Sequence, residues 1–139
     1  MSYWLLKSEP NVFSWQDQMR RGDTGEPWTG VRNHSAKLNL MAMKTGDQAF
    51  FYHSNIGKEI VGIVTVIREA YPDPTAADGP WVCVDVRAAI ALPTPLTLKR
   101  IKEDPTLQEM ALIKLSRLSV QPVTDDQWRR VCHLSGLPA

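Results

Sequence analysis

The sequence predicts an α/β protein of the α+β kind: a mixed β-barrel or curled sheet of about five or six strands, flanked by short helices. The first observation is a sharp alternation over residues 81–90, typical of a strand with one buried face. The apolar side chains on this face are Val82, Val84, Val86, Ala88 and Ile90. The second observation is two runs rich in aromatic and β-branched residues, 48–54 and 59–71, joined by a hairpin at 55–58. Short helical patterns separate the strands without a regular βαβ rhythm, which favours a mostly antiparallel sheet.

The first part of the chain adds a strand and two helices. The apolar run at residues 3–6 suits a buried first strand. Ser14, with Asp17 three residues later, is a capping signature for a short helix that ends at Gly22. Asn33 or Ser35 would cap a second helix, which we expect to end at Gly46.

The second part of the chain begins with a loop at residues 71–80, which hold three prolines and a glycine. Beyond the strand at 81–90, Leu98 and Ile101 share a helical face, and Pro105 ends that helix. Residues 118–123 are expected to form the last strand, and the final helix would bury Trp128. The capping pairs of the last two helices would be Thr106 with Glu109 and Thr124 with Gln127.

Length and charge favour one domain over residues 1–139 and argue against non-specific binding of nucleic acid. A chain of this length has room for one core. Sixteen basic residues balance fifteen acidic ones, which leaves a net charge of +1 and no basic tract. Non-specific affinity for nucleic acid comes from many phosphate contacts, so here it would be weak and little affected by salt. Any recognition must be local.

The two cysteines and the hydropathy pattern indicate a cytoplasmic protein without a membrane partner. Cys83 and Cys132 form neither a CxxC motif nor a zinc-ligand spacing, so we expect two free thiols in a reducing compartment. The sequence contains no apolar stretch of the roughly 18 residues that a membrane helix needs. Residues 1–7 are too short and too polar for a signal peptide.

Sequence signatures of catalysis are absent. The chain has no phosphate-binding loop, no GxSxG or HExxH motif and no carboxylate run suited to a metal. His34, His53 and His133 each stand alone, and a lone histidine is more often a packed or surface residue than a base. We therefore expect no catalytic residue, no metal and no cofactor.

Five tryptophans in so short a chain form the most informative feature. Trp4, Trp15 and Trp128 lie in strand or helix patterns and belong in the core. Trp28 lies in a loop rich in glycine and proline, and Trp81 opens a strand on its polar face. Such residues either cover the core or form an aromatic slot, and stacking a base on an aromatic ring is worth roughly 1–3 kcal/mol.

Six blocks of sequence carry a resemblance to a known family. They are YWLLKSEP at 3–10, WTGVRN at 28–33, FFYHS at 50–54, AYPD at 70–73, WVCVDV at 81–86 and SRLSVQP at 116–122. In this order, over residues 3–122, they resemble the EVE domain. The fold of that domain is similar to those of PUA, ASCH and YTH domains.

The resemblance implies a PUA-like barrel with a pocket for a modified base, either modified cytosine in DNA or a modified base in RNA. By this likeness Lys7 and Ser8 would form the pocket floor and Trp28 one wall of an aromatic cage. Asn33 would offer amide hydrogen bonds to a base edge. The other ligand-binding residues that the resemblance implies are Tyr52, His53, Ser54, Trp81, Ser116 and Arg117.

The sequence departs from the family pattern at two places: the first changes the expected polar contacts, and the second predicts a more open pocket. Leu38 stands where relatives carry a polar residue, which removes one polar group from the turn after Asn33. The loop after Asp73 reaches Trp81 in seven residues, whereas many relatives carry a longer insertion.

These observations favour a non-catalytic binding module whose partner is nucleic acid with a modified base. Two alternatives stay open. The first is an ASCH-like ribonuclease in which Lys7, His53 and Arg117 supply a general base and phosphate-binding cations. The second is a pocket for a free nucleoside or a small anionic metabolite.

Overall fold

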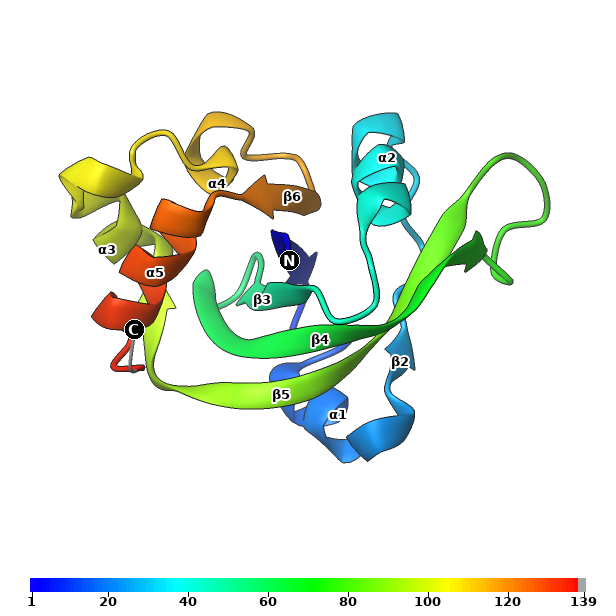
Figure 1. Ribbon diagram of the computed structural model, residues 1–139, viewed down its shortest axis with the longest axis horizontal. Helices are drawn as coiled ribbons and strands as arrows, with labels where there is room; N and C mark the ends of the chain where they lie inside the picture. The colour runs from blue at the N-terminus through cyan, green and yellow to red at the C-terminus, as the bar shows by residue number, and fades with distance from the viewer. Residues whose placement is uncertain (138–139) are drawn as a thin grey trace.

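A mixed sheet of six strands organises the protein (Figure 1). The structure, a computed structural model, describes residues 1–137. The strands are β1 (Tyr3–Ser8), β2 (Glu26–Pro27), β3 (Gln48–His53), β4 (Glu59–Pro72), β5 (Val82–Thr97) and β6 (Val120–Val123). Their order across the sheet is β2-β5-β4-β3-β1-β6, with β1 and β3 parallel and the other neighbours antiparallel. The predicted fold class is confirmed in its open form, because β2 and β6 lie at the two edges and the sheet does not close into a barrel.

Short helices lie on both faces of the sheet (Figure 1). They are α1 (Trp15–Arg20), α2 (His34–Ala42), α3 (Leu98–Glu103), α4 (Ala111–Lys114) and α5 (Asp125–Leu134), with 3₁₀ turns η1 (Gly22–Thr24) and η2 (Pro105–Leu107). The capping boxes predicted at Ser14 and Thr124 are both present. Asn33, rather than Ser35, caps α2, which ends at Ala42, four residues before the predicted end at Gly46.

Two hydrophobic cores lie on opposite faces of the sheet, because successive side chains of a strand point to opposite sides. The first core contains Trp4, Leu6 and Phe51, and it includes residues of α1 and α2. The second contains Leu5 and Phe50, and it is closed by α3, α4 and α5. Trp4, Trp15 and Trp128 are all buried in these cores, as the sequence predicts.

An irregularity in β5 carries that strand from the first core to the second. Ile63 pairs with Ile90 while Val64 pairs with Ala88, so β5 holds one extra residue at this point. Upstream of it, Val84 and Val86 are buried in the first core; downstream, Leu92 and Leu96 are buried in the second. The prediction that Ile90 shares the buried face of Val84 is therefore wrong, and Ile90 is 45% exposed.

Several element boundaries differ from the sequence prediction because tertiary pairing decides them. β1 continues to Ser8 alongside β3, and β6 begins at Val120, where its pairing with β1 begins. Asp104, rather than Thr106, caps the turn that follows α3, since its carboxylate accepts from the backbone N–H of Thr106. Both cysteines are buried and free, as expected. Among the described residues no helix combines the length and the apolar character of a membrane span.

Gly62 in β4 allows α1 to approach the sheet closely. A Cβ atom at this position would lie 2.4 Å from the ring of Trp15, a distance that would force the tryptophan or the strand to move. We expect Gly62→Ala to lower the free energy of unfolding by about 1–3 kcal/mol, the usual effect of overpacking a core. Urea denaturation measures this loss. Thr65→Ala, at a half-buried position of the same strand, is the control, and an equal loss there would contradict the steric explanation.

Asp104 links α3, η2 and α5 through a buried carboxylate. It accepts hydrogen bonds from the hydroxyl of Thr106 at 2.5 Å, from its backbone N–H at 2.9 Å and from Arg130 Nε at 2.9 Å. The hydroxyl bond of Thr106 lowers the pKa of Asp104 most strongly. Burial raises it, but the further bonds from Arg130 and the Thr106 backbone bring the pKa to about 2.

Acid should therefore destabilise the protein through Asp104. Because the folded-state pKa lies below that of the unfolded chain, this stabilisation is complete above about pH 4 and is lost as the pH falls towards about 2. We expect wild-type protein to lose about 2 kcal/mol more than Asp104→Asn between pH 5 and pH 2. Urea denaturation at each pH measures the difference. Parallel pH profiles for the two proteins would contradict the assignment.

Candidate functional site

A depression of about 440 Å³ opens where β1 ends, and we refer to it as the β1 depression. Three segments form it: the end of β1, the turn that leads to α1, and β2 with the residues that follow. Its lining residues are Lys7, Ser8, Glu9, Val12, Phe13, Arg21, Glu26, Pro27, Trp28 and Thr29. Its volume falls in the range of small-ligand pockets, roughly 300–1,000 Å³. Three predicted site residues, Lys7, Ser8 and Trp28, therefore meet here.

Trp28 is both a core residue and part of the wall of this depression. Its ring packs edge-on against Phe51, with centroids 5.6 Å apart, and against Phe13 at 6.3 Å. Its backbone N–H donates to the carbonyl of Val84 at 2.7 Å. The side chain is 8% exposed. Trp28 therefore belongs to the first core and also lines the β1 depression, while its role towards a base stays a prediction.

Asp73 anchors the segment that follows Trp28. Its buried carboxylate accepts from the backbone N–H of Gly30 at 2.8 Å, from Arg32 at 3.0 Å, and from both the backbone and the hydroxyl of Thr75 at 2.7 Å. Burial raises the pKa of Asp73, but these hydrogen bonds outweigh it and bring the pKa to about 2. Sequence analysis assigned Asp73 no role. Its place in the AYPD block was the signal, but its partners Gly30 and Arg32 lie about forty residues away.

Charged groups of both signs lie along the β1 depression. Lys7 donates to the carbonyl of Ser116 at 2.5 Å, and burial lowers the pKa of its amine. Glu26 forms an ion pair with Arg21 at 3.1 Å, and burial raises the pKa of its carboxyl above the usual value. Glu9 supplies a second carboxylate, which accepts from the side-chain amide of Asn55. The depression therefore offers hydrogen-bond donors and acceptors beside an aromatic wall.

Two further depressions hold most of the other predicted site residues. The Tyr52 depression, about 210 Å³, is lined by Lys7, Tyr52, Ser54, Asn55, Lys58, Leu98, Leu112 and Ser116. The Asn33 depression, about 370 Å³, is lined by Asn33, Ser35, Lys114, Leu115, Ser116, Arg117 and Leu118. Lys7 lines both the β1 and the Tyr52 depressions, and Ser116 lines both the Tyr52 and the Asn33 depressions. The three depressions are therefore contiguous.

Asn33 has part of its hydrogen-bonding capacity already in use. Its Oδ1 accepts from the backbone N–H of Ala36 at 2.9 Å as the cap of α2. The side-chain N–H₂ group is the part that remains for a ligand. Because Asn33 lines the Asn33 depression and not the β1 depression, the structure separates it from Trp28.

His53 and Trp81 lie outside these three depressions. His53 Nε2 accepts from the backbone N–H of Trp15 at 3.1 Å, and burial lowers the pKa of the imidazole, which favours its neutral form. The ring of Trp81 packs beside His34, with centroids 5.4 Å apart, and the guanidinium of Arg32 lies 5.9 Å from its centre. Neither side chain joins Trp28 in one slot.

The side chains that line the β1 depression determine what it can offer to a ligand. Within residues 1–137 no three side chains of histidine, cysteine, aspartate or glutamate gather in one place. The lining of the β1 depression includes the aromatic side chains of Trp28 and Phe13 together with hydrogen-bond donors and acceptors. Such an arrangement can hold a planar heterocycle, with stacking on one face and hydrogen bonds around its rim.

Comparison with known proteins places the chain in a family. The model of the EVE domain matches residues 2–134. Thymocyte nuclear protein 1 of Gallus gallus is 36% identical over an alignment of 164 positions, gaps included. The alignment covers 95% of this chain and 68% of that protein. The solved structure of a protein from Rhodopseudomonas palustris is 61% identical, with a TM-score of 0.93, and the match covers 98% of this chain and 94% of that one.

A third relative was solved with a ligand. The crystal structure of human THYN1 protein in complex with 5-methylcytosine-containing DNA matches with a TM-score of 0.89 and 33% identity, covering 100% of both chains. The matches extend over nearly the whole chain in sequence and in structure. On the strength of this agreement, the chain belongs to the EVE domain family.

Proposed function

We propose that the protein is a non-catalytic module that binds DNA carrying a modified cytosine and holds that base in the β1 depression. The observation that carries the proposal is the arrangement around Trp28, where an aromatic wall faces polar groups of both signs. The human THYN1 complex with 5-methylcytosine-containing DNA supports the choice of base and of nucleic acid.

The lining of the β1 depression matches the groups that 5-methylcytosine presents. Cytosine offers an N4 amino donor, and carboxylates are its usual acceptors in proteins. Glu26 and Glu9 would accept from this amino group, while Lys7 and the hydroxyl of Thr29 would donate to the ring acceptors. Val12 and Phe13 supply apolar surface for the 5-methyl group. A modification at this carbon would therefore add apolar contact without leaving a polar group unsatisfied.

The geometry calls for a single base removed from its stack. Extruding a paired base costs a few kcal/mol, which stacking on Trp28 and hydrogen bonds at the base edge would offset. Modified RNA and free nucleosides present the same flat surface. The binding experiment therefore compares all three kinds of ligand.

The ribonuclease alternative receives less support from the contacts of His53. A general base needs an available lone pair, and the Nε2 lone pair of His53 already accepts from the backbone of Trp15. We therefore propose that the protein performs no chemistry on its ligand.

The proposal is tested by equilibrium binding of matched oligonucleotides, DNA and RNA, that contain cytosine or 5-methylcytosine at one position, alongside the free nucleosides. We expect tighter binding of the methylated DNA. Trp28→Ala should weaken it by about 1–3 kcal/mol, the value of one base stack. Equal affinity for both oligonucleotides would refute the proposal, and binding of the free nucleoside alone would favour the metabolite alternative.

The tryptophan experiment needs a stability control because Trp28 is buried. Its loss should also destabilise the fold by about 3–5 kcal/mol, so binding is measured where denaturation curves show the variant to be folded. Trp81→Ala is the matched variant. It removes a half-buried tryptophan outside the β1 depression, and we expect it to change affinity less than twofold. An equal effect of both variants would contradict the assignment of Trp28 as the stacking wall.

Incubation of the purified protein with labelled DNA and RNA should yield no cleavage products. The reason is that the Nε2 lone pair of His53 is engaged in a structural hydrogen bond from the backbone of Trp15. The test is gel analysis over a range of pH, with and without divalent cations. Cleavage that disappears in a folded His53→Gln or Lys7→Met variant would instead establish the ribonuclease alternative.

A further inference from the structure

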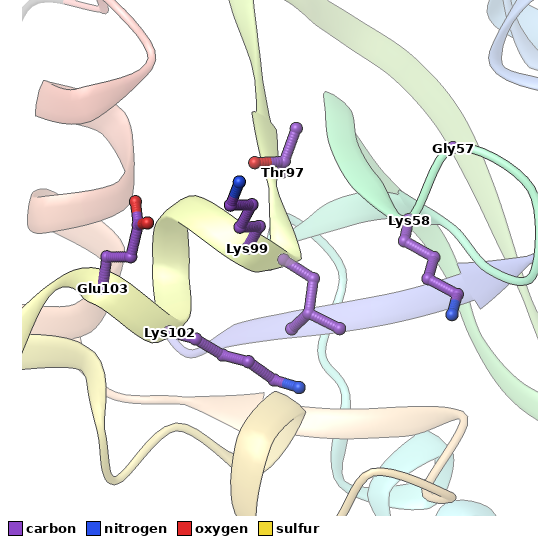
Figure 2. Close-up of a pocket in the computed structure, with 7 residues that line it drawn as sticks. Gly57, Lys58, Thr97, Lys99, Lys102 and Glu103 are labelled. Carbon is purple, nitrogen blue, oxygen red and sulfur yellow. The ribbon is translucent and has the colours of Figure 1, made fainter.

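A fourth depression, about 620 Å³, lies between the β3–β4 turn and α3, and we refer to it as the lysine depression. Lys58 comes from the turn, while Lys99 and Lys102 come from α3. Figure 2 shows Lys58 and Lys102 extending from the two sides into the space between these segments, with Glu103 directed away from them. Three lysines and one carboxylate, Glu103, thus line the depression together with Leu98, and the ammonium of Lys99 is directed towards Thr97 (Figure 2).

The three lysines have no ionic partners among residues 1–137. No carboxylate approaches Lys58, Lys99 or Lys102 within 4.0 Å, whereas nearby Arg100 and Arg130 both reach Asp104. Lysines gathered without counter-charges repel one another and create a positive potential, which attracts anions to a concave surface. The lysine depression is therefore locally positive, although the charges of the whole chain nearly cancel.

The Tyr52 depression lies between the lysine depression and the site of the proposed base, because it shares lining residues with each of them. Lys58 and Leu98 line both it and the Tyr52 depression, and Lys7 lines both the Tyr52 and the β1 depressions. Shared lining residues therefore relate the surroundings of Trp28, through Lys7, to Lys58 and α3. A ligand that extends beyond a single base would pass along these residues.

We propose that the lysine depression binds the backbone phosphates of the DNA strand that carries the recognised base, on one side of that base. The inference rests on the proposed function, since it extends the ligand out of the β1 depression. Lysine ammonium groups suit this task because they bind phosphates as point charges and carry no base preference. The base specifies the site, and the lysine depression adds affinity that does not depend on sequence.

The test uses single-stranded oligonucleotides of three lengths: a trinucleotide with 5-methylcytosine at its centre, and the same core extended only on its 5′ side or only on its 3′ side. Wild-type protein should gain affinity from one extension and not from the other. The triple variant Lys58→Gln, Lys99→Gln, Lys102→Gln should lose this gain and bind the trinucleotide as wild type does. All three side chains are exposed, so thermal denaturation should show an unchanged fold.

The dependence of oligonucleotide affinity on salt concentration measures how much the three lysines contribute to phosphate binding. Each phosphate contact on a single strand contributes about 0.7 to the slope of log affinity against log salt. Three lost contacts should flatten that slope by about 2 for the extended oligonucleotide. Between 50 and 200 mM salt, wild type should then lose about 15-fold more affinity than the variant. The charge-matched control is Lys44→Gln, Arg68→Gln, Arg129→Gln, whose residues line none of the four depressions.

The outcomes separate this inference from the proposed function. A triple variant that behaves like the charge-matched control, or that weakens the trinucleotide as much as the extended strand, overturns the lysine assignment and leaves base recognition intact. A length-dependent gain that the variant loses, without any preference for 5-methylcytosine, supports the lysine assignment and overturns base recognition. Tight calorimetric binding of inorganic phosphate with no gain from either extension would identify a small-anion site and overturn the inference.

Discussion

In the parallel strands β1 and β3, successive side chains point into opposite cores. The other features of the structure depend on this constraint. Both faces of the sheet are covered, so a shift of one residue in either strand would exchange the contents of the two cores. This constraint also positions the site. Lys7 lies on the face of Leu5 and is paired with Tyr52, while Ser8 lies on the opposite face and its hydroxyl donates to the carbonyl of Phe13. Consecutive residues thereby line the site from both sides of the sheet.

Trp28 couples the proposed binding surface to the stability of the fold. Its ring belongs to the first core, and the same ring forms part of the wall of the β1 depression. Asp73 holds the following segment through Gly30 and Arg32, so the wall is supported by a buried carboxylate from the β4–β5 connection. A rigid wall loses little conformational entropy when a ligand binds, which raises affinity without additional contacts.

The positive and negative charges of the protein nearly cancel in sum, but they are distributed unevenly over the structure. Buried carboxylates such as Asp104 and Asp73 are satisfied by arginines and by hydroxyl or backbone donors. Lys58, Lys99 and Lys102 gather around one hollow without such partners among the described residues. Net charge describes long-range attraction and solubility, whereas a local cluster acts within about a Debye length, roughly 8–10 Å in physiological salt. A nearly neutral protein therefore retains one surface suited to phosphates.

The sequence by itself determined the features that depend on neighbouring residues. The capping boxes at Ser14 and Thr124 and the tryptophans of the two cores follow from short-range patterns, and the six matching blocks identified the family and the α/β fold class. They left a barrel and a curled sheet as alternatives, and the structure shows that the sheet stays open. The tertiary structure decided what joins distant segments. The extra residue in β5 exposes Ile90, Asp73 meets Gly30, Trp81 packs beside His34 away from Trp28, and α3 brings two lysines to Lys58. The spacing of residues in the sequence does not predict these long-range contacts, because each depends on how the strands pair and how the sheet bends.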